Sequence, residues 1–190
     1  MRKLLVTLLV MLLAGSLLAV GTSRGASPQS QTADVTVLIP NLVAIYLNNN
    51  VTFDFSNITA NPSNSPYPPD VFPAWYLPTS PSASPYESLT VWTNNPSGWT
   101  LTTKGSGDFA TTLPLSDLYY APDGEPKTAD GSATAGGNWV AFSTTDQTVA
   151  SSSAKTTGWE EYNQDYEIML DGDEEPGTYT VTITYTITGN

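Results

Sequence analysis

The 190-residue chain contains neither cysteine nor histidine, and only 6 basic residues stand against 18 acidic ones. Without cysteine the chain forms no disulfide and offers no thiolate nucleophile. Without histidine it has neither a Ser-His-Asp nor a Cys-His catalytic group, and it lacks the commonest ligand of transition metals. The formal net charge of −12 argues against partners rich in phosphate, so we expect no binding to nucleic acid or to anionic membranes.

The N-terminus has the order of a secretory signal peptide. Two basic residues, an apolar run over residues 4–13 and small residues up to Ala26 follow one another. We therefore expect residues 1–26 to be a signal peptide and residues 27–190 to be one exported domain at the cell surface, with a retained membrane anchor as the alternative. Cleavage removes three basic residues, so the mature charge is 3 − 18 = −15. The mature protein is not expected to span a membrane.

The rest of the chain predicts an all-β fold. Threonine alternates with apolar residues from Thr178 to Thr188, which places one face of a strand in a core and the other in water. Other short runs rich in β-branched and aromatic residues lie between Gly, Pro and Asn, at residues 35–39, 42–47, 51–55, 89–92, 99–102, 117–120, 139–142, 148–150 and 166–170. No window has a helical period. We expect a single antiparallel β-sandwich, Ig-like or jelly-roll-like, with a long loop of proline and aromatic residues.

Turn-forming residues separate two pairs of these runs and predict two hairpins. Residues 171–177 join the run 166–170 to the closing strand, and residues 94–98 join 89–92 to 99–102. We expect the two members of each pair to be neighbours in one sheet.

Carboxylates are the only plausible catalytic groups, and nothing in the sequence marks a pair of them, so we expect no enzymatic activity. Polar positions in alternating runs, such as Asp54 and Glu167, indicate solvated strand faces. The densest acidic run consists of Asp171, Asp173, Glu174 and Glu175. Its oxygens suit Ca²⁺, but the run lacks the spacing of a twelve-residue calcium loop, and a solvated turn has the same composition. We favour the solvated turn and predict no other cofactor.

The stretch from residue 61 to residue 85 is rich in proline, which lacks the amide donor that a ladder requires. It is therefore predicted to be a long ordered loop or surface arm. Two roles are open for its rings, which are partner binding and burial over an open end of the sandwich. A carbohydrate-binding module that uses the loop 67–86 is the alternative function. The candidate partner-binding rings are Tyr67, Phe72, Trp75 and Tyr76.

Two pieces of the chain carry a resemblance. The motif Gly98-Trp99-Thr100-Leu101-Thr102 and the Thr-rich closing segment resemble the WxL-type domains of bacterial surfaces, which have a Trp-x-Leu in mid-domain and a second one near the end. That resemblance implies non-covalent attachment to the cell wall, with Trp99 and Leu101 as wall-binding residues. Tyr185-Thr186-Ile187 stands where the second motif would be. The closing strand is also similar to those of pilus and fibre subunits that polymerise by strand donation.

These features predict an exported, non-enzymatic structural protein whose partners are like subunits or a cell-envelope polymer. In strand donation, residues 34–39 would complete a neighbour's sheet, with Val35, Val37 and Ile39 in its pockets. The same segment also fits the first strand of its own domain. The sequence leaves both arrangements open.

Overall fold

The computed structural model describes residues 33–48, 50–122 and 139–190, and the structural statements below refer to these ranges. The chain consists of one unit that ends at Ile39 and a second, compact unit, Pro40–Asn190, which contains all the strands of the described residues. The predicted signal peptide lies outside the described residues. Among the described helices, none is both long and apolar enough to cross a membrane.

The second unit consists of short strands and two 3₁₀ turns, η1 (Ile58–Ala60) and η2 (Leu115–Asp117). The strands are β1 (Val43–Leu47), β2 (Ala74–Tyr76), β3 (Leu89–Thr93), β4 (Trp99–Gly105), β5 (Leu118–Pro122), β6 (Val140–Ala141), β7 (Gln147–Ser152), β8 (Glu160–Glu161), β9 (Gln164–Leu170) and β10 (Ile183–Gly189). These bounds confirm most of the strand runs predicted from the sequence.

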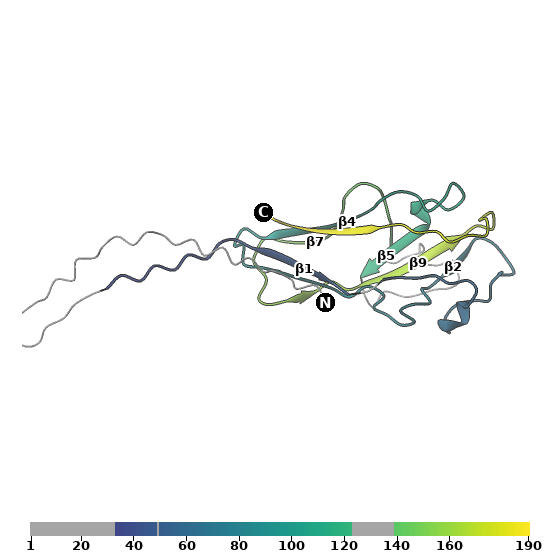
Figure 1. Ribbon diagram of the computed structural model, residues 1–190, viewed down its shortest axis with the longest axis horizontal. Helices are drawn as coiled ribbons and strands as arrows, with labels where there is room; N and C mark the ends of the chain where they lie inside the picture. Colours follow the sequence, from purple (N-terminus) through teal and green to yellow (C-terminus); the bar gives the residue numbers. More distant parts are fainter. Residues whose placement is uncertain (1–32, 49, 123–138) are drawn as a thin grey trace, which may run out of the picture. The chain divides into compact units, whose positions relative to one another are not determined.

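The strands form three antiparallel sheets, with the orders β1-β3-β8, β2-β9-β5-β6 and β10-β4-β7. A bridge between Glu87 and Gln164 connects the first two sheets, so together they make one layer. Figure 1 shows β4, β7 and the yellow β10 along the upper side of this unit and β1 along the lower side. The predicted all-β fold and antiparallel sandwich are confirmed.

The closing segment shows why the prediction of the fold succeeded, although only Ile183–Gly189 forms a strand and residues 178–182 belong to none. Its threonines are exposed from Thr178 to Thr188, whereas Tyr185 is buried and the apolar residues on either side of it are half-buried. Tyr185 also connects the two layers, because its hydroxyl lies 2.7 Å from that of Tyr166 on β9. Burial raises the pKa of both tyrosines, so both stay neutral at physiological pH.

Both predicted hairpins are wrong. β9 pairs with β2 and β5, whereas β10 pairs with β4. Likewise β3 pairs with β1 and β8, whereas β4 pairs with β10 and β7. The turn residues therefore carry the chain from one layer to the other. An alternating pattern indicates which face of a strand is buried, and it does not indicate which strand lies beside it.

Three other segments differ from the expected assignments. The proline-rich stretch contains a strand, β2, whose residues pair with 168–170 of β9. Residues 51–55 alternate between half-buried and exposed, but only Thr52 forms a bridge, to Ser80. The run 35–39, expected as a strand, belongs to none.

Candidate functional site

The segment 34–39, here called the donor segment, exposes an unusual amount of apolar surface. Val35, Val37 and Ile39 are 87%, 76% and 73% exposed, and Leu38 is 90% exposed. The segment contains one charged residue, Asp34, and neither glycine nor proline. Contiguous apolar surface of this kind is characteristic of interaction sites, because leaving it in water costs free energy.

The chain enters the sandwich directly after the donor segment and is fixed there by Asn94. The Asn94 side-chain amide donates to the carbonyl of Pro40 (2.8 Å), and its carbonyl oxygen accepts from the backbone N–H of Leu42 (2.7 Å). The Thr93 hydroxyl also donates to the carbonyl of Leu42 (2.7 Å). These bonds define the point from which the donor segment leaves the domain.

The aromatic arm is divided between buried and exposed rings. Trp75 and Tyr76 lie on β2 and are 5% and 0% exposed. The Trp75 ring packs against that of Tyr119, with 4.9 Å between centroids. Tyr67 and Phe72 are 42% and 37% exposed. Trp75 and Tyr76 therefore contribute to the core, and of the four candidate rings only Tyr67 and Phe72 stay exposed to a partner.

The acidic turn between β9 and β10 brings three of its four carboxylates together. Oxygens of Asp171, Asp173 and Glu174 all lie within 4.8 Å of one another, and this group does not include Glu175. The Glu174 carboxylate also accepts from the backbone N–H groups of Asp171 (2.8 Å) and Gly172 (3.1 Å). Such a group has the oxygen ligands that Ca²⁺ prefers, although it also stabilises its own turn. Calcium binding stays a prediction.

Asp117 on η2 is affected by the acidic turn. Partial burial, together with the negative charges of Asp171, Glu174, Asp173 and Asp108, raises its pKa to about 6. A carboxyl with this pKa is partly protonated just below neutral pH. The region is therefore sensitive to pH.

Trp99 and Leu101, the wall-binding residues implied by the WxL resemblance, are both fully buried. They pack in the core cluster that also holds Leu89, Val91 and Tyr185. Direct contact between these two side chains and a wall polymer would require the sandwich to open.

Sequence reasoning missed three buried carboxylates. Glu167, expected on a solvated face, is 0% exposed, as is Asp165 two residues earlier on β9. Glu87 is also buried, and its carboxylate accepts from the backbone N–H of Asn48 (3.2 Å). β9 is a central strand that is buried on both faces, and a polar residue at an alternating position looks the same in such a strand as on a wet face. No pattern in the sequence distinguished the two cases.

Comparisons of the chain with protein-family models, with curated proteins and with solved structures each gave no match. What the protein does must therefore be inferred from its own residues and geometry.

Proposed function

We propose that this protein is an exported structural protein of the cell surface or extracellular space, which assembles with copies of itself by donating residues 34–39 as a β-strand. It acts through contacts with other protein chains or with a cell-envelope polymer, and not through catalysis. The observation that carries this proposal is the exposure of Val35, Val37 and Ile39, each at least 73% accessible.

The composition of the donor segment supports a strand. Val35, Val37 and Ile39 are β-branched and recur with the period of two that places them on one face. A strand added to a sheet edge gains main-chain hydrogen bonds along its whole length, while alternate side chains enter pockets. A flexible adhesive tail would need no such period. The alternation of these three residues therefore favours β-strand addition over nonspecific association.

The experiment replaces the apolar face and keeps the rest of the chain. The predicted mature form, which begins at residue 27, is purified alongside a donor variant with the substitutions Val35→Thr, Val37→Thr and Ile39→Thr. Threonine retains the branched shape and strand propensity and removes apolar surface. Electron microscopy should show fibres of the parent chain and none of the donor variant.

The control is Leu38→Thr, which removes the most exposed apolar residue of the segment from its other face. This variant should form fibres like the parent. Monodisperse parent chains at high concentration, or fibres formed by the donor variant, would contradict strand donation.

A further inference from the structure

The free edges of the two layers lie on the same side of the sandwich. Among the described residues, β1 ends the sheet β1-β3-β8 and β10 ends the sheet β10-β4-β7. These two strands contact each other across the layers. At their point of approach, a Cβ on Gly189 would lie 3.5 Å from the Val43 side chain.

Beyond this contact the edges continue as two alternating segments. Residues 51–55 follow β1, and residues 178–183 lead into β10 and include its first residue, Ile183. Both segments pack on the larger core cluster through side chains that are only half-buried: Val51, Phe53, Phe55, Tyr179, Val181 and Ile183. We call the surface formed by these six side chains the open seam. It is a place where the sandwich core is incompletely covered.

The backbone of the seam faces outward at alternate residues. The backbone N–H of Thr182 donates to the Ser106 hydroxyl (3.1 Å), and its carbonyl accepts from the Ser106 N–H (2.9 Å). Thr182 therefore faces the β4 side. Because backbone groups alternate between the two edges of a strand, those of Val181 and Ile183 face the opposite edge. Among the described residues, no strand pairs with β10 on that edge.

We propose that the open seam accepts the donor segment of a second copy of this chain. The backbone of that donor segment pairs with the backbone of Val181 and Ile183. This inference rests on the proposed function and names the acceptor. Both surfaces are almost free of charge: Asp34 is the only ionisable residue of the donor segment, and Asp54 of residues 51–55 is exposed on the wet face. Val35, Val37 and Ile39 supply the apolar groups that would complete the cover of the core.

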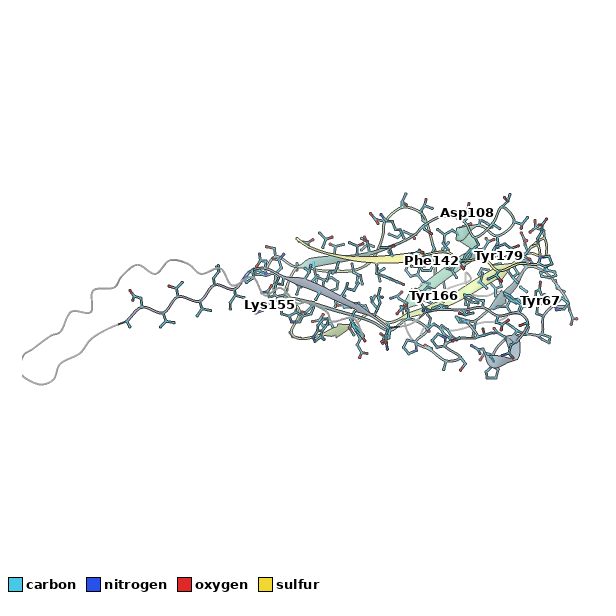
Figure 2. The ribbon with its side chains drawn as sticks, in the orientation of Figure 1. Tyr67, Asp108, Phe142, Lys155, Tyr166 and Tyr179 are labelled. Carbon is cyan, nitrogen blue, oxygen red and sulfur yellow. The ribbon has the colours of Figure 1, made fainter. Side chains whose placement is uncertain are left out.

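The donor segment leaves the sandwich at the end remote from the seam. Its exit at Pro40 is held by Asn94, and the next residue, Asn95, donates to the carbonyl of Asn190 at the C-terminus (2.8 Å). Within the unit Pro40–Asn190, Figure 2 shows Tyr179 toward one end and Lys155 near the other. The residue after Lys155, Thr156, is hydrogen-bonded to Thr93 of β3. The exit and the C-terminus thus share the end opposite Tyr179.

The chain is too short for its own donor segment to fill the seam. The eight residue steps from Val181 to Gly189 span about 26 Å at the rise of a β-strand. The three steps from Pro40 back to Val37 span only about 10 Å. A donor segment 34–39 that fills the seam must therefore come from another copy. Because each copy donates at one end and accepts at the other, the assembly is an open head-to-tail chain.

The other edge of the upper layer suits a donor less well. Its strand β7 has the sequence Gln-Thr-Val-Ala-Ser-Ser, with Val149 as its only large apolar residue. The adjoining Asp146 carries an ion pair with Lys104 (3.2 Å). A donor segment bound at β7 would therefore have few apolar side chains to cover.

The test mixes two defective chains. An acceptor variant carries Val181→Thr and Ile183→Thr and can donate but not accept, whereas the donor variant can accept but not donate. Each alone should be monomeric at concentrations at least about tenfold above those at which the parent assembles. Mixed, they should form 1:1 dimers and no fibres, as measured by light scattering after size-exclusion chromatography.

The outcomes separate this inference from the proposed function. Fibres of the acceptor variant would overturn the seam as acceptor and leave strand donation standing, whereas fibres of the donor variant would overturn both. Ile187→Thr is the matched control, since it changes a half-buried residue of β10 outside the seam, and it should leave assembly unchanged.

A second measurement avoids any loss of folding in the acceptor variant. A peptide of residues 33–40 with a photoreactive group at position 37 is added to the donor variant and irradiated. Mass spectrometry should locate the crosslink within residues 51–55 or 178–183. A crosslink at β7, or no crosslink, would overturn the assignment.

Discussion

The contribution of a single donor side chain to assembly can be worked out for Val37→Ala. The substitution removes two methyl groups, worth ~0.8 kcal/mol each on burial, from a side chain that is 76% exposed before assembly. If the seam covers that surface, the loss is ~1.2 kcal/mol per subunit added to a fibre. This corresponds to a rise of ~8-fold in the critical concentration, since ~1.4 kcal/mol is a factor of ten.

The assay is the concentration of chain left in the supernatant after fibres are sedimented at equilibrium. Leu38→Ala is the reference, because it removes more carbon from a side chain that is 90% exposed but lies on the other face of the segment. It should change the critical concentration less than ~2-fold. A larger effect of Leu38→Ala than of Val37→Ala would refute the face-specific account and indicate general apolar adhesion.

Three more predictions follow from charge and backbone geometry. The predicted mature charge of −15 should make assembly salt-dependent, because like-charged subunits repel one another. Raising NaCl from about 10 to 150 mM shortens the Debye length from ~30 to ~8 Å and should therefore lower the critical concentration. An unchanged critical concentration would contradict this. Because the pKa of Asp117 is about 6 when folded and 3.8 ordinarily, its charge destabilises the fold above pH 6 and ceases to do so as the pH falls towards 4. Asp117→Asn should therefore stabilise the protein by about 1 kcal/mol at pH 7, after allowance for screening by solvent, and by nothing at pH 4. The measurement is urea unfolding, and equal free energies of unfolding for the variant and the parent chain at pH 7 would contradict this reasoning. Gly98→Ala should destabilise the fold by more than ~3 kcal/mol, because φ is +95° and the new Cβ would lie 2.0 Å from the Ser152 carbonyl oxygen. Thermal melts measure this effect, and Gly158→Ala is the control: with open space around it, it should change stability little, and equal stabilities of the two variants would contradict the reasoning.

The fold class could be predicted because most strands of this sandwich have one wet face. From Thr178 to Thr188 each threonine is exposed, and the period of two alone indicated it. The neighbours of a strand could not be predicted in the same way. The turns at 94–98 and 171–177 have hairpin composition, yet both cross between layers, since glycine and asparagine permit a reversal without fixing its partner.

The candidate site could be predicted only in part, because the sequence indicates which face of a strand is apolar and not which strand lies beside it. The pattern of Val35, Val37 and Ile39 indicated a strand with one apolar face, but a strand that awaits a partner has the same sequence as one already paired. Trp75 and Tyr76 were candidates for partner binding because proline surrounds them, whereas pairing of β2 with β9 buries both. The open seam was not visible in the sequence. It depends on two segments, 51–55 and 178–183, that only the fold brings to the same side.

The most direct test of strand donation uses the absence of cysteine from the natural chain. One chain carries Val37→Cys and a second, of different mass, carries Val181→Cys, so that any disulfide joining the two masses must link different copies. Mild oxidation of the mixture should produce a covalent dimer of the two masses, and Leu38→Cys in place of Val37→Cys should give far less of it. No mixed dimer, or equal amounts from positions 37 and 38, would contradict donation of residues 34–39 into the seam of a neighbouring subunit.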